Sequence, residues 1–278
     1  MSLQLSDVSD FLFVLAIGVV MFFRFTRVSR EQAHTAAELQ AARAIQERLV
    51  PAQLPPVAGY AIEAAYFPAE EVGGDFYQVL QGSGDTTLLV VGDVSGKGLK
   101  AAMTGTLAMG ALRALAGEGL EPAAMLMRLS RQLTETNSEG FVTCLCARIG
   151  HEGEVTLANA GHLMPYHNGK EVQLPPGLPL GIVPDIIYEG QELRLCPGDR
   201  LTLLSDGVVE AQNARGELFG FERTQALSRE PADAIADAAR RFGQADDITV
   251  MTLTRRSNSA IRTEPDLSQD EAEAAARS

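Results

Sequence analysis

Four motifs of the chain each place an aspartate beside a glycine or at the end of an apolar run. The aspartates are Asp75 in VGGDFY, Asp93 in VVGDVSGKG, Asp206 in LLSDGVVEA, and the pair Asp246 and Asp247 in DDITV. A single Asp-Gly turn after a strand is usually structural, because aspartate hydrogen-bonds the backbone of turns. Four such places together indicate a shared site, since carboxylates, backbone carbonyls and waters bind hard divalent cations such as Mg²⁺ and Mn²⁺.

Two other kinds of chemistry fit the sequence poorly. The stretch from Gly92 to Gly98 superficially resembles a nucleotide-binding loop, but the pattern GxxxxGK[ST] needs a glycine where this chain has Lys97. Cysteine chemistry is also disfavoured. None of the three cysteines is followed by the arginine of a tyrosine-phosphatase signature, and no CxxC or Cys/His spacing suits zinc.

The composition sets broad limits on what the chain can be. It has 278 residues, of which 46% are hydrophobic, which is enough for a packed core in one sizeable domain with accessory segments. The net charge is −13 and the pI is near 4.8. A nucleic-acid-binding protein should present a basic face, so we predict no nucleic-acid partner.

Strand-like and helix-like segments alternate in clusters between residues 57 and 255. The strands are predicted at 60–67, 76–80, 87–92, 141–149, 154–160, 186–195, 200–205 and 248–254. The helices are predicted at 99–116, 121–136, 222–229 and 231–242. Because the strands come in clusters and the helices in pairs, the pattern predicts an α+β domain of packed sheets covered by helices.

Residues 11–23 form an uninterrupted apolar run, and Arg24, Arg27 and Arg30 follow directly. The run is short for a bilayer, where about 20 residues are expected. The arginines would place the rest of the chain in the cytoplasm by the positive-inside rule. We predict that residues 1–26 form a single-pass anchor in the inner (cytoplasmic) membrane. The alternative is a buried or partner-bound amphipathic helix.

Residues 27–56 are typical of a helical linker that ends at a group of prolines. Heptad-like spacing within it predicts a homodimer seam in residues 27–50, formed by Leu39, Ala42, Gln46 and Leu49. An ordinary amphipathic helix is the alternative, because the pattern covers too few heptads to establish a coiled coil. Residues 57–255 are predicted to be the globular domain. Residues 256–278 are polar and acidic, and they are predicted to be a disordered tail.

The motifs VGGDFY, GDVSGKG, NAGH, LLSDGVVEA and DDITV, in this order, resemble those of the bacterial PPM-type (PP2C-like) serine phosphatases. The branch that regulates sporulation and sigma factors is the most similar, and the resemblance covers about residues 38–254. It implies a PP2C-like central β-sandwich flanked by pairs of helices, in α/β/β/α layers. It also implies a site for two divalent cations, Mn²⁺ or Mg²⁺, at one end of the sandwich.

The resemblance also implies a role for each matching residue. Asp93 would bridge both metals together with the backbone carbonyl of Val94. Asp75 would hold one metal, and Asp206 and Asp246 would hold the other. Asp93 and Asp206 are the residues expected to matter most for catalysis. Because DDITV begins with two aspartates, Asp247 is the alternative ligand. If it is not a ligand, it is expected to form a local hydrogen bond.

By resemblance, the chain is a metal-dependent phosphatase that uses a metal-activated water to hydrolyse phosphoserine or phosphothreonine. The substrate implied is a phosphorylated anti-anti-sigma-type or related signalling protein. The alternative is a catalytically weak, membrane-linked binding or scaffold module of the same fold. His162 of NAGH is either a general acid or a structural hydrogen-bonding residue. Residues 99–137, which follow Asp93, are a candidate regulatory element.

Overall fold

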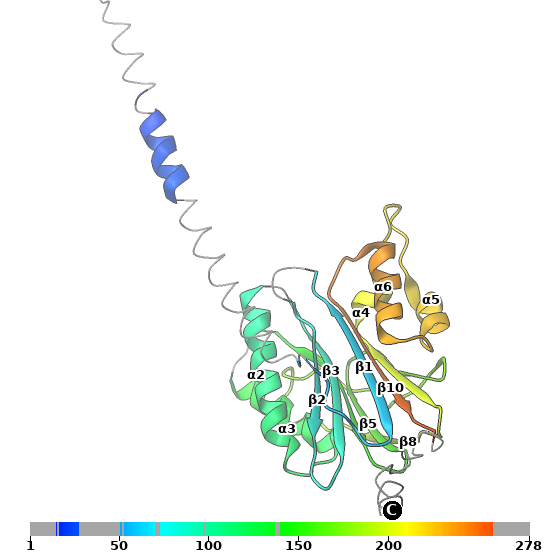
Figure 1. The fold of residues 1–278 in the computed structure, drawn as a ribbon. Coiled ribbons are helices and arrows are strands. Elements are labelled where there is room, and N and C mark those ends of the chain that lie inside the picture. The colour runs from blue at the N-terminus through cyan, green and yellow to red at the C-terminus, as the bar shows by residue number, and fades with distance from the viewer. Residues whose placement is uncertain are drawn as a thin grey trace, which may run out of the picture.

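The computed structural model describes residues 15, 17–27, 51, 53–69, 73–96, 98–136 and 140–257. Two antiparallel five-stranded sheets lie face to face (Figure 1). The first sheet has the order β1 (Tyr60–Phe67), β10 (Ile248–Arg255), β9 (Arg200–Leu204), β6 (Tyr166–His167) and β7 (Lys170–Glu171). The second has the order β2 (Phe76–Gln81), β3 (Thr87–Val94), β4 (Val142–Ile149), β5 (Glu154–Ala160) and β8 (Gly190–Arg194).

Helices cover the outer face of each sheet (Figure 1). Those on the second sheet are α2 (Leu99–Ala116) and α3 (Pro122–Glu135), and those on the first are α4 (Asp206–Val209), α5 (Gly220–Leu227) and α6 (Ala232–Gly243). Three buried clusters fill the spaces between successive layers. The predicted β-sandwich with helices on both sides is therefore confirmed.

Strand β3 shows why the inner strands are almost continuously apolar. Leu88 and Val90 pack toward α2 and α3, whereas Leu89 and Val91 pack toward the other sheet. Because successive side chains point to opposite faces, a strand between two buried layers needs apolar residues at every position. All four side chains are at most 2% exposed. This burial fixes the register of β3 and so the position of the aspartate that follows.

The predicted long strands and helices agree with the structure to within a few residues. The exceptions are short elements, namely the two-residue strands β6 and β7 and the four-residue helix α4, none of which was predicted. The strand predicted over 186–195 is limited to β8. Hydrophobic periodicity cannot indicate elements of two to four residues, because they are shorter than one period of the pattern.

The structure describes only part of the N-terminal region for which the sequence predicts an anchor and a linker. Residues 17–27 are helical, but residues 11–14 and 16 of the predicted membrane-spanning run lie outside the described part of the chain. Among the residues that the structure describes, no helix combines the length and the apolar character needed to cross a membrane. The predicted linker over 28–50 and the tail from 258 onward also lie outside the described residues.

Candidate metal centre at one end of the sandwich

The second sheet supplies two of the predicted site residues. Strands β2 and β3 pair with Phe76 opposite Gly92, so Asp75 and Asp93, which flank this pair, lie at the same end of the sheet. The Phe76 ring occupies the space that a side chain at Gly92 would need, because a Cβ there would lie 2.5 Å from a ring carbon. The glycine therefore lets the chains that carry both aspartates approach closely.

The first sheet supplies the remaining predicted site residues, Asp206 and the aspartate doublet before β10. Strand β9 ends at Leu204, and Asp206 begins α4 two residues later. Strand β10 pairs antiparallel with β9, so the doublet that precedes β10 lies beside Asp206. Contact is closest at Gly207, where an added Cβ would lie 1.8 Å from the backbone oxygen of Asp247. Only glycine fits between the start of α4 and the start of β10.

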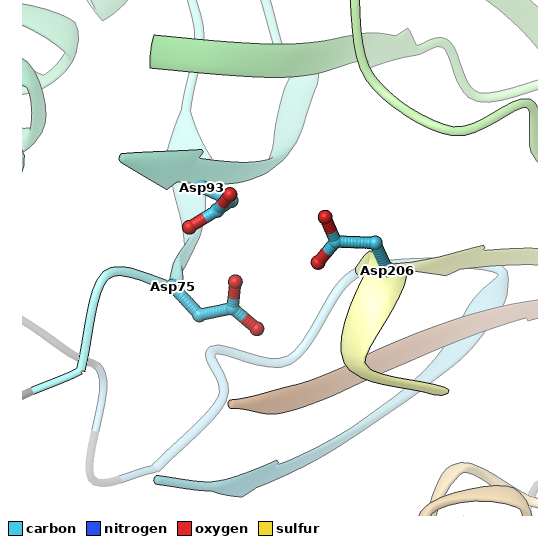
Figure 2. A group of neighbouring side chains, drawn as sticks. All are labelled: Asp75, Asp93 and Asp206. Carbon is cyan, nitrogen blue, oxygen red and sulfur yellow. The ribbon is translucent and has the colours of Figure 1, made fainter. Parts of the chain in front are cut away.

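Asp75, Asp93 and Asp206 converge at this end of the sandwich (Figure 2). Each offers a carboxylate oxygen, and the three oxygens lie within 4.8 Å of one another. Asp75 is only 1% exposed, whereas the other two are partly exposed. Three carboxylates at this separation repel one another unless protons or cations offset their charge.

The pKa values reflect this crowding. Burial, followed by the charge of Asp93, raises the pKa of Asp75 well above its ordinary value. Burial, followed by the charges of Asp206 and then Asp246, raises the pKa of Asp93 to about 7. Burial and then Asp246 also raise the pKa of Asp206. Near neutral pH the group therefore gains stability from a bound cation.

The backbone carbonyl of Val94 lies next to the carboxylate of Asp93. A Cβ added at Gly74 would lie 2.9 Å from Asp93 Oδ1 and also 2.9 Å from the Val94 oxygen. Two of the predicted ligand oxygens thus face the same glycine. An all-oxygen set of carboxylates and a backbone carbonyl suits hard cations such as Mg²⁺ and Mn²⁺. The residues present therefore fit a divalent metal centre.

The two aspartates of the doublet differ in their surroundings. Asp246 is not one of the three closest carboxylates, but its charge raises the pKa of both Asp93 and Asp206, and its Oδ1 accepts a hydrogen bond from the Asp247 N–H at 2.9 Å. Asp247 is 6% exposed, and its carboxylate accepts hydrogen bonds from backbone N–H groups before β2. Metal binding by Asp246 stays a prediction.

No described hydrogen bond joins the His162 ring to a carboxylate of the acidic group. Its ring Nδ1 is 2.8 Å from the hydroxyl of Thr143, the residue opposite Asp93 on β4, and its backbone N–H donates to Asn159. Burial lowers the pKa of His162 to about 4, and the Leu204 carbonyl opposes this shift. The ring is therefore neutral at physiological pH. Its burial and contacts favour the structural role over that of general acid.

Two polar residues next to the aspartates were missed in the sequence. Thr249 donates its hydroxyl to Asp75 Oδ2 at 2.6 Å, and the Ser205 hydroxyl accepts the Thr249 N–H at 3.0 Å. Both belong to motifs already quoted, SDG and DDIT. Strand alternation is the sequence feature that could have identified Thr249, because residues two apart in a strand lie on the same side and Asp247 was already a candidate. Lys97, near Asp93, lies outside the described residues.

A family model described as Stage II sporulation protein E (SpoIIE) matches residues 83–256, which is more than half of the chain. Phosphoserine phosphatase RsbU of Bacillus subtilis (strain 168) is 28% identical over 156 residues. That match covers 55% of this chain and 46% of the relative. The chain thus spans less than half the length of this relative.

Solved structures share the fold. The SiaA-PP2C domain of Pseudomonas aeruginosa is 24% identical, with a TM-score of 0.66 over 81% of this chain and 98% of that one. A structure of RsbU and RsbW domains from Mycobacterium tuberculosis is 25% identical, with a TM-score of 0.64 over 75% of this chain and 63% of that one. The predicted PP2C-like fold is confirmed by these structures.

Proposed function

The chain belongs to the SpoIIE family of PP2C-type (PPM) phosphatases, and on this basis we propose that it is a metal-dependent protein phosphatase acting on phosphoserine or phosphothreonine. The observation that supports this most directly is the convergence of Asp75, Asp93 and Asp206 at one end of the sandwich. The name of the B. subtilis relative, a phosphoserine phosphatase, supports the same substrate class.

The residues would act mainly by binding and positioning. When bound, two divalent cations lower the pKa of water and offset negative charge on phosphoryl oxygens. Asp93 interacts electrostatically with both of the other carboxylates. The charge of Asp206 raises the pKa of Asp93, and the charge of Asp93 raises the pKa of Asp75. Asp93 and the Val94 carbonyl would therefore hold both cations, Asp75 would hold one of them, and Asp206 and Asp246 would hold the other.

The test is hydrolysis of p-nitrophenyl phosphate and of a phosphoserine peptide by the full chain, with and without Mn²⁺. We expect activity that depends on Mn²⁺ and that is lost in both Asp93→Asn and Asp206→Asn. Activity that survives Asp93→Asn would contradict the mechanism. A folded wild-type chain without turnover at any Mn²⁺ or Mg²⁺ concentration would favour the scaffold alternative.

We infer that the physiological substrate is a phosphorylated signalling protein of the anti-anti-sigma type. Support comes from the family and from the M. tuberculosis structure, in which an RsbU domain occurs with an RsbW domain. Comparing phosphoproteins in cells with and without the gene tests this proposal. A small protein whose phosphoserine accumulates in the deletion strain, and is dephosphorylated by the purified chain, is the expected result.

Two proposals on the N-terminal region rest on the sequence alone. We propose a membrane anchor through residues 11–23, with the phosphatase domain in the cytoplasm, and a homodimer through residues 27–50. Membrane fractionation of the full chain and of a chain starting at Ser29 tests the first. Sedimentation of chains starting at Ser29 and at Val57 tests the second. Equal fractionation of the first pair would contradict the membrane anchor, and an equal number of chains per particle in the second pair would contradict the dimer.

A further inference from the structure

We propose that the start of β10 positions the acidic group, with Asp247 fixing the backbone that carries Asp75 and Thr249 orienting the Asp75 carboxylate. The inference rests on the proposed metal-dependent function and assigns roles to two residues outside the predicted ligand set. Both would be positioning residues, which act on the cations only through the aspartates that bind them.

Asp247 binds the backbone on the N-terminal side of β2. Its Oδ1 accepts the N–H of Ala69 at 2.7 Å, and its Oδ2 accepts the N–H groups of Gly74 at 2.6 Å and of Asp75 at 3.3 Å. These donors lie more than 170 residues away in the sequence. Hydrogen bonds to an ionised carboxylate are the stronger kind. One side chain therefore joins both ends of the segment that connects β1 to β2.

The packing around this carboxylate requires a glycine at position 73. A Cβ added at Gly73 would lie 2.4 Å from Asp247 Oδ2 and 2.4 Å from the Tyr66 hydroxyl. The Gly74 carbonyl, in turn, accepts the N–H of Val94 at 3.2 Å. A continuous path of contacts thus runs from Asp247 through Gly74 to Val94, whose own carbonyl is a predicted ligand.

Thr249 acts on the side chain rather than the backbone. Its hydroxyl donates to Asp75 Oδ2 at 2.6 Å, and both residues are at most 1% exposed. Its backbone N–H donates to the Ser205 hydroxyl and its carbonyl accepts the Ser205 N–H, next to Asp206. The same residue therefore contacts Asp75 from one sheet and the residue before Asp206 from the other. Such outer partners fix the orientation of a ligating carboxylate.

The first experiment compares two buried threonines of β10. In Thr249→Val the hydroxyl to Asp75 is lost. Thr252→Val removes the hydrogen bond, 3.1 Å long, that the Thr252 hydroxyl donates to Glu63. Glu63 lies outside the acidic group. Calorimetric titration of the full chain with Mn²⁺ should show binding weakened about 10- to 100-fold in Thr249→Val. Binding should be unchanged in Thr252→Val and close to wild type in Thr249→Ser, which keeps the hydroxyl.

Turnover gives a second readout. At saturating Mn²⁺, Thr249→Val should approach the wild-type kcat, because the aspartates that bind the cations are all present. Wild-type Mn²⁺ affinity in a folded Thr249→Val chain, or equal weakening in Thr252→Val, would overturn this inference alone. A wild-type chain that binds no Mn²⁺ would overturn the proposed function, and this inference with it.

The second experiment separates positioning from ligation at Asp247. In Asp247→Asn one carboxylate oxygen is replaced by an amide nitrogen, which cannot accept the backbone N–H bonds. The number of Mn²⁺ ions bound per chain should equal that of the wild type, while the affinity and the thermal shift on adding Mn²⁺ both decrease. Loss of one Mn²⁺ per chain would instead make Asp247 a ligand and overturn its positioning role.

Discussion

Strand β9 has an aspartate beside a glycine at each end, and the two have opposite surroundings. Before the strand, Asp199 follows Gly198 and accepts hydrogen bonds from the Asn168 side chain, the Cys196 backbone and His167. Burial would raise the pKa of Asp199, but these hydrogen bonds outweigh it and lower the pKa. After the strand, burial and then the charge of Asp246 raise the pKa of Asp206.

The comparison shows what distinguishes a structural Asp-Gly turn from a candidate metal ligand. Both aspartates stand at the end of the same apolar strand, and sequence spacing alone treats them alike. Asp206 is the more buried of the two, and its charged neighbours are carboxylates, whereas Asp199 is surrounded by hydrogen-bond donors. Hydrogen bonds from donors stabilise the negative charge of an aspartate, whereas an aspartate that faces other carboxylates needs a cation to offset the repulsion. Matched variants at the two ends of β9 can test this distinction.

The largest expected effect is on activity. Asp206→Asn should lower kcat/KM for p-nitrophenyl phosphate by at least about 100-fold, since losing a ligand should cost more than the 10- to 100-fold typical of an outer partner. Asp199→Asn should keep near wild-type activity in the folded chain, because it lies at the opposite end of the strand. A similar decrease in kcat/KM in both variants would contradict the distinction between the two aspartates.

Cation binding should separate the same variants by stability. With Mn²⁺ at about 100 times its dissociation constant, the wild type and Asp199→Asn should each gain about 2.7 kcal/mol in the free energy of unfolding. Asp206→Asn should gain much less. Chemical denaturation with and without EDTA measures this gain. An equal gain in all three chains would show that Mn²⁺ binds elsewhere.

The pH dependence follows from the raised pKa of Asp93. In the metal-free protein this pKa is about 7, above the ordinary 3.8, so between these values the folded chain holds a proton that the unfolded chain has lost. The metal-free chain should therefore lose stability as the pH rises through this window.

Mn²⁺ must displace that proton below pH 7, so its affinity should fall by up to about tenfold per pH unit as the solution becomes more acidic. The gain in stability on adding Mn²⁺ should accordingly increase from pH 5 to pH 7 and then level off. Subtracting the metal-free curve removes the contribution of His162, which is the same in both states. A gain that is constant across this range would contradict the raised pKa.

The smallest expected effect is at the structural end of β9. Asp199→Asn should cost about 1 kcal/mol in the free energy of unfolding, because the amide replaces only part of the hydrogen bonding. Metal-free Asp206→Asn should instead be at least as stable as the wild type, since repulsion among carboxylates is relieved. Denaturation in EDTA measures both values. A destabilised Asp206→Asn would mean that its carboxylate is held by donors after all.

Much of the fold could be predicted because the long strands are buried on both faces. A run such as Leu88 to Val91 has little choice of position once it must pack on helices and on a second sheet. The meeting of Asp75, Asp93 and Asp206 agrees with the arrangement that the motifs indicated. The short elements β6, β7 and α4 could not be predicted, because tertiary pairing rather than local pattern determines them.

The different surroundings of Asp246 and Asp247 could not be predicted from the doublet. Two adjacent aspartates have the same composition and nearly the same sequence context. What distinguishes them is the segment around Ala69 and Gly74, which is distant in the sequence but donates hydrogen bonds to Asp247. Only the folded chain shows which carboxylate meets those N–H groups.

The sheet order has a consequence for the order of events during synthesis. Strand β10 is the last of the strands that the structure describes, yet it lies between β1 and β9. While the ribosome still holds this strand, β1 and β9 have no common partner, and Asp75 lacks the Thr249 hydroxyl. Unpaired strand edges favour association with other chains. A nascent chain therefore cannot complete the acidic group until almost all of the domain has emerged.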